Sequence, residues 1–86
     1  MGTLKKEYRD LETKVLATLR EMVNNSETES KHLNGKAIKV NIFGYTELVI
    51  INDRLTFLDS NGYHYSLFNG DCTLEDLIDI IEKHKN

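Results

Sequence analysis

A run of aliphatic residues in the middle of the chain constrains the fold more than any other feature. The run is Leu48–Ile51, in a segment of residues 46–51 that lies between Gly44 and the turn signal Asn52-Asp53. A short apolar run between turn signals is typical of a buried β-strand, because helices need longer segments. Successive side chains of a strand point to opposite faces of its sheet. Both faces of this strand therefore need a cover, either a helix or a second copy of the chain.

Three further segments resemble strands and are joined by short connections. The expected strands are residues 37–43, 46–51, 54–59 and 63–68. Asn61-Gly62 is the strongest hairpin signal, because a type I′ turn needs positive φ at both of its central positions. Parallel neighbours would need a crossover of about a dozen residues. The sheet is therefore predicted to be a four-stranded antiparallel meander.

Helical periodicity lies on either side of this predicted sheet. In residues 4–23 the apolar residues recur every three or four positions and share one face, as an amphipathic helix requires. They are Leu4, Tyr8, Leu11, Val15, Leu19 and Met22. A C-terminal helix begins after Thr73, a good N-cap that forms a capping box with Asp76, and Cys72 and Leu77 occupy the positions of a hydrophobic staple. The order of elements predicts a two-layer α+β fold.

The chain of 86 residues is expected to form one α+β domain, residues 1–86. Its longest polar stretch, residues 24–36, has Leu33 as its one apolar side chain and is expected to be a mobile loop. A domain of this size buries roughly 60–65% of the surface of its unfolded chain. The single cysteine, Cys72, excludes an internal disulfide. Self-association is a common way to stabilise so small a core.

Charge and composition exclude several classes of partner. The net charge of −3 argues against sequence-independent binding to nucleic acid, which needs a basic face. No apolar run approaches the ~18–20 residues that cross a membrane. The N-terminus has no apolar segment of a secretory signal. Together with the lone cysteine, these features predict a cytoplasmic protein with no nucleic-acid or membrane partner.

No group of residues has the spacing of a catalytic, cofactor-binding or metal site. The metal-ligating residue types are three histidines and one cysteine, without the short spacings of zinc sites. They are His32, His64, His84 and Cys72. Cys72 precedes a helix, a place that can lower the pKa of a thiol, but a buried and unreactive thiol is the better interpretation. We therefore expect no enzyme, no cofactor and no metal.

The predicted function is a non-enzymatic interaction module that forms a homodimer or binds an unknown protein partner. If both helices cover one sheet face, the other face carries an apolar patch of the kind that marks partner surfaces. Its residues are Phe43, Val49, Ile51, Leu58 and Phe68. That face or an exposed sheet edge is the expected contact, and the first helix is a second route. If the helices lie on opposite faces, no patch exists, and the sequence leaves both arrangements open.

The alternative function is a small-ligand-binding protein or a minor enzyme. Its site would lie between the 24–36 loop and the sheet, where a polar segment meets a rigid scaffold. His32, His64 and Cys72 would be its polar members.

Overall fold

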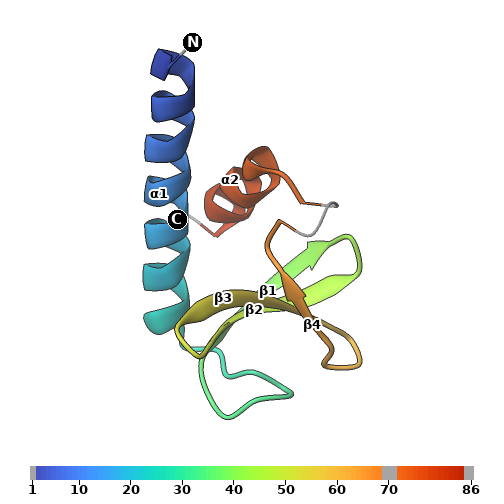
Figure 1. Cartoon of the computed structure of the whole chain (residues 1–86). Coiled ribbons are helices and arrows are strands. Elements are labelled where there is room, and N and C mark those ends of the chain that lie inside the picture. The colour runs from blue at the N-terminus through green and yellow to red at the C-terminus, as the bar shows by residue number, and fades with distance from the viewer. Residues whose placement is uncertain (1, 69–71, 85–86) are drawn as a thin grey trace.

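An antiparallel sheet lies between two helices on one side and a long loop on the other (Figure 1). This computed structural model describes residues 2–68 and 72–84, and only the backbone of residues 2–6. The elements in chain order are α1 (Gly2–Asn24), β1 (Ala37–Ile42), β2 (Tyr45–Ile51), β3 (Arg54–Asp59), β4 (His64–Ser66) and α2 (Leu74–Lys83).

The predicted α+β meander is confirmed. The strands lie in the order β1-β2-β3-β4, and each is antiparallel to its neighbour. The last strand is shorter than the predicted 63–68, because β4 covers only His64–Ser66 and Leu67 and Phe68 already belong to a turn.

The three hairpin turns differ from the expectation at one place. Asn52 and Asp53 both have positive φ, 50° and 66°, and form the two-residue turn that the sequence indicated. Gly62 has φ 86°, but Asn61 is not among the described residues with positive φ, so the predicted type I′ turn at Asn61-Gly62 is wrong. The Asp59 carboxylate accepts a hydrogen bond from the Asn61 N–H at 2.8 Å and so stabilises a longer loop that ends on Gly62.

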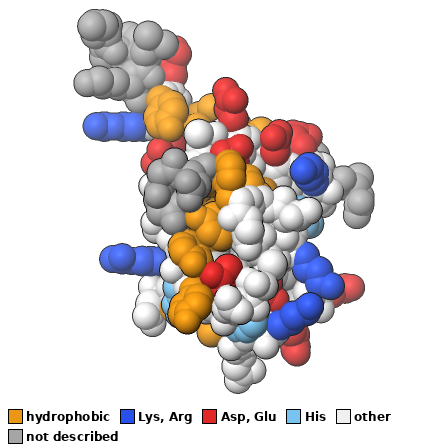
Figure 2. All heavy atoms as spheres, turned by 90° about the vertical axis from the view of Figure 1, so that its right-hand side faces the viewer, with side chains coloured by type: hydrophobic (Ala, Val, Ile, Leu, Met, Phe, Trp, Pro, Cys, Tyr) orange, Lys and Arg blue, Asp and Glu red, His pale blue; other side chains and the backbone are white. Residues whose placement is uncertain are grey.

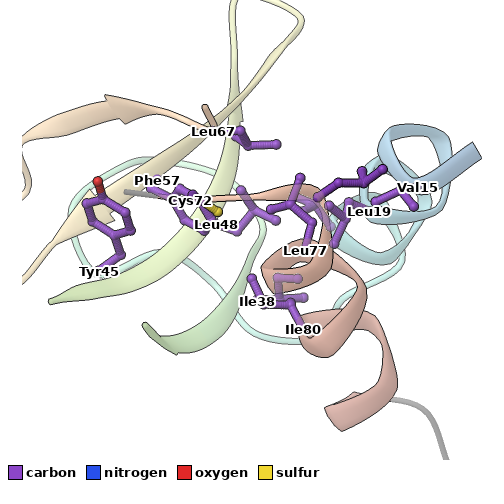
Figure 3. Close-up of a cluster of buried hydrophobic side chains, with 12 residues drawn as sticks. Val15, Leu19, Ile38, Tyr45, Leu48, Phe57, Leu67, Cys72, Leu77 and Ile80 are labelled. Carbon is purple, nitrogen blue, oxygen red and sulfur yellow. The ribbon is translucent and has the colours of Figure 1, made fainter. Parts of the chain in front are cut away.

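Both helices pack on the same face of the sheet. Figure 3 shows Val15 and Leu19 of α1 and Leu77 of α2 next to the strand residues Ile38 and Leu48. Leu19, Leu48 and Leu77 are each 0% exposed.

The capping box predicted at the start of α2 is confirmed. The Thr73 side chain accepts from the Asp76 N–H at 3.3 Å, and the Asp76 carboxylate accepts from the Thr73 N–H at 2.8 Å. The two neighbours that the staple would join, Cys72 and Leu77, are both buried in the core cluster that contains the helices. These bonds fix the point at which the chain turns from the sheet into α2.

The opposite face of the sheet is also covered, but by the 24–36 loop. Ala37, Val49 and Leu58 form a second buried cluster, and Leu33 of the loop and Ile51 pack against it. The loop passes beneath the strands in Figure 1. On this second face, the run Leu48–Ile51 is therefore covered by the loop, and not by a helix or a second copy of the chain.

Candidate interaction surface

The carboxylate of Glu47 anchors the 24–36 loop to the sheet. Glu47 is the one buried charged side chain among the described residues, and it is 3% exposed. Its Oε1 accepts a hydrogen bond from the Ser30 hydroxyl at 2.7 Å, and its Oε2 accepts from the Lys31 N–H at 2.9 Å. Ser30 Oγ in turn accepts from the Leu33 N–H at 3.0 Å. Because both carboxylate oxygens have partners, the buried charge holds the loop in place.

A second attachment lies where the loop enters β1. The Ser26 hydroxyl donates to the Ala37 carbonyl at 2.6 Å and accepts from the Thr28 N–H at 3.0 Å. The Ala37 N–H donates to the Thr28 carbonyl at 3.0 Å. Both polar groups of the first β1 residue are thus satisfied by the loop, which closes this end of the sheet edge.

The structure does not bring the five predicted surface residues together. Val49 and Leu58 are 1% and 0% exposed beneath the loop, and Ile51 is half-buried beside them. Phe43 is exposed at the β1–β2 turn, whereas Phe68 is exposed after β4. While the loop lies in this position, Val49 and Leu58 are inaccessible to a partner.

The free edge at β1 is poorly suited to strand addition. The pairing of β1 with β2 is irregular between Lys39 and Ile42. Lys39 is exposed, and charged residues and irregular pairing are two of the devices that discourage edge-to-edge association. A groove of about 460 Å³ lies between β1 and α2, and Asp76 and Lys83 of α2 line it.

The apolar stripe of α1 continues beyond the body of the domain. Val15 and Leu19 are 5% and 0% exposed, but Tyr8 and Leu11 on the same stripe are 53% and 45% exposed. Figure 1 shows the cause, since the N-terminal turns of α1 extend past α2 and the sheet. A helix of 23 residues is ~35 Å long, which exceeds what this sheet and α2 can cover.

The polar residues considered for a ligand site lie on different sides of the sheet. Cys72 belongs to the core on the helix face, whereas His64 pairs with Leu58, a member of the cluster under the loop. His32 lies over the β3–β4 turn, where a Cβ on Gly62 would come within 2.9 Å of His32 Nδ1. Burial, reinforced by the charge of Asp76, raises the pKa of the Cys72 thiol to about 11. No cluster of three metal-ligating side chains occurs among the described residues.

Asp59 organises the β3–β4 turn through its carboxylate. It accepts hydrogen bonds from the Tyr65 hydroxyl at 2.8 Å and from the Tyr63 N–H at 3.0 Å. Desolvation acts to raise the pKa of Asp59, but these bonds, with those of the Asn61 and Gly62 N–H groups, outweigh it and lower the pKa. The bond to Asp59 and desolvation raise the pKa of the Tyr65 hydroxyl.

Comparisons with known proteins add no assignment. No family model matches the chain, and neither a curated protein nor a solved structure matches it. In the part of the chain that the structure describes, no helix is long and apolar enough to cross a membrane. Function is therefore inferred from the surface of the domain.

Proposed function

We propose that the protein is a non-enzymatic interaction module that self-associates. The observation that carries this proposal is the exposed part of the α1 stripe, where Tyr8 and Leu11 are 53% and 45% exposed. Neighbouring large apolar side chains outside the core are typical of partner surfaces. The loop covers the second sheet face, β1 has a protected edge, and β4 at the other edge is only three residues long. We therefore assign the contact to α1, the second route that the sequence offered.

The proposal includes the cellular location of the protein and the class of its partner. The lone cysteine supports a reducing, cytoplasmic location. The net charge of −3 supports a protein partner over a nucleic acid.

The alternative of a small-ligand site has weaker support. Two hollows lie between the loop and the sheet: one of about 280 Å³ beside His32 and Glu47, and one of about 420 Å³ beside Leu33 and Val49. Ligand pockets fix their ligand through a few polar groups that point into the pocket. In the first hollow both oxygens of Glu47 are already bonded to the loop, and the second is lined by none of the three predicted polar members.

Light scattering over a concentration series tests self-association. A monomer has a mass of 9.9 kDa, and we expect the weight-average mass to rise toward twice this value. A series that reaches about 1 mM detects association free energies as weak as about −4 kcal/mol. A mass that stays at the monomer value throughout the series would falsify the proposal.

A further inference from the structure

We infer that two copies of the protein pair through the N-terminal halves of α1 in an antiparallel orientation, with Tyr8 of each copy against Leu11 of the other. This inference rests on the proposed self-association and specifies its partner, contact and geometry.

The spacing of the exposed residues is that of a helix-pairing seam. Tyr8, Leu11 and Val15 are separated by three and four positions, which correspond to a, d and a of a heptad. Val15 is buried in its own domain, so Tyr8 and Leu11 remain for a partner. Around a twofold axis each contact occurs twice, so a Tyr8 layer against Leu11 of the second copy is self-complementary.

Charges beside this seam select the antiparallel orientation. With Tyr8 level with Leu11 of the partner helix, the side chain of Glu7 lies nearest to Lys14 of the second copy, and the twofold axis repeats the pair. Both of these Glu7–Lys14 pairs are attractive, because they bring opposite charges together. In a parallel pair, Glu7 would instead meet Glu12 of the second copy, which is a repulsive contact.

Glu7 and Lys14 are available for this role. Both are exposed, and the one ion pair among the described side chains joins Arg20 to Asp53 at 2.9 Å. Figure 2 shows hydrophobic side chains exposed next to charged ones at the projecting end of the molecule. The surface thus offers an apolar centre with charged margins, as interfaces between helices require.

Charge reversal tests the pairing. Glu7→Lys and Lys14→Glu should each weaken the dimer roughly tenfold, because each turns two attractive pairs into repulsive ones. The double variant Glu7→Lys/Lys14→Glu should restore wild-type affinity. Arg9→Glu is the matched control for Lys14→Glu: it makes the same charge change at an exposed position about 140° around α1 from Lys14, outside the seam, and should have a small effect. Circular dichroism confirms that each variant is folded.

Spin labels test the orientation. A label on Glu21→Cys, at an exposed position, should be ~35 Å along the helix axis from its mate in the antiparallel pair, and ~10–15 Å away in a parallel pair. The parent protein with its buried Cys72 controls for background labelling. A dimer that ignores both charge reversals, or that gives the short distance, would overturn this inference and leave self-association intact. A monomer at every concentration would overturn both.

Discussion

The hydroxyl of Ser30 donates a hydrogen bond of 2.7 Å to the carboxylate of Glu47, across the boundary between the polar loop and the sheet. Glu47 lies opposite Leu58 in the β2–β3 pairing, on the face that the loop covers. The buried charge and the apolar cluster therefore share one cover, so losing the anchor exposes both.

Removing the anchor should destabilise the domain. We expect Glu47→Ala to lower the free energy of unfolding by about 2–3 kcal/mol, because hydrogen bonds to a buried charge are among the stronger ones. Glu47→Gln should have a smaller effect, since its amide oxygen still accepts one bond. Urea denaturation measures the change, and hydrogen exchange should become faster at the Lys31 and Leu33 amides.

The control for this substitution lies in the same loop. Glu29 is exposed, and Glu29→Ala should change stability by less than about 0.5 kcal/mol. Equal effects of the Glu29 and Glu47 substitutions would contradict the anchoring role.

Local patterns in the sequence predicted most of the fold. The apolar run Leu48–Ile51 and the turn residues indicated the strands, and the Thr73 and Asp76 pair indicated the start of α2. The loop cover could not be predicted in the same way, because Leu33 is its one apolar contact and hydrogen bonds hold the rest. The signal in the sequence was Glu47, a charged residue on the same strand face as the apolar Val49 and Ile51.

The candidate surface on α1 could also be predicted only in part. The sequence placed Tyr8 and Leu11 on the apolar stripe of the first helix, but stripe membership does not decide exposure. Exposure depends on how far α2 and the sheet reach along α1, which is a property of the tertiary structure (Figure 1). The sequence grouped Val49 and Leu58 in an apolar surface patch, and in the structure the loop covers both residues.

A charge beneath the loop should unfold the domain. Leu58 is 0% exposed, so Leu58→Asp would bury an unpaired carboxylate at a cost of several kcal/mol, comparable to the stability of a domain this small. Far-ultraviolet circular dichroism should show loss of structure. Phe68→Asp makes a similar change at a 42% exposed position and should leave the fold intact. A folded Leu58→Asp protein that has only lost its dimer would instead support a contact at the sheet face.

Acid should weaken the β3–β4 turn through Asp59. Its pKa in the folded protein lies below the ordinary value of 3.8, so the unfolded chain binds the proton more tightly. This contribution is therefore complete above pH ~4 and is lost as the pH falls through the folded pKa. Tyr65→Phe removes one bond to the carboxylate and should reduce the pH dependence of stability in this range. An acid-unfolding profile parallel to that of the wild type would contradict the assignment.

The thiol of Cys72 should resist modification at neutral pH. Its pKa of about 11, against an ordinary 9.0, reduces the thiolate fraction at pH 8 by roughly a hundredfold, and the thiolate is the reactive form. Cys72 is also 6% exposed, which blocks access to a reagent. Alkylation should therefore be slow in the folded protein and rapid in urea, with the unfolded chain as the control for intrinsic reactivity. Fast alkylation of the folded protein would mean that the chain opens readily before Thr73, and the capping box that holds α2 against the core would then be weaker than its hydrogen bonds of 2.8 and 3.3 Å imply.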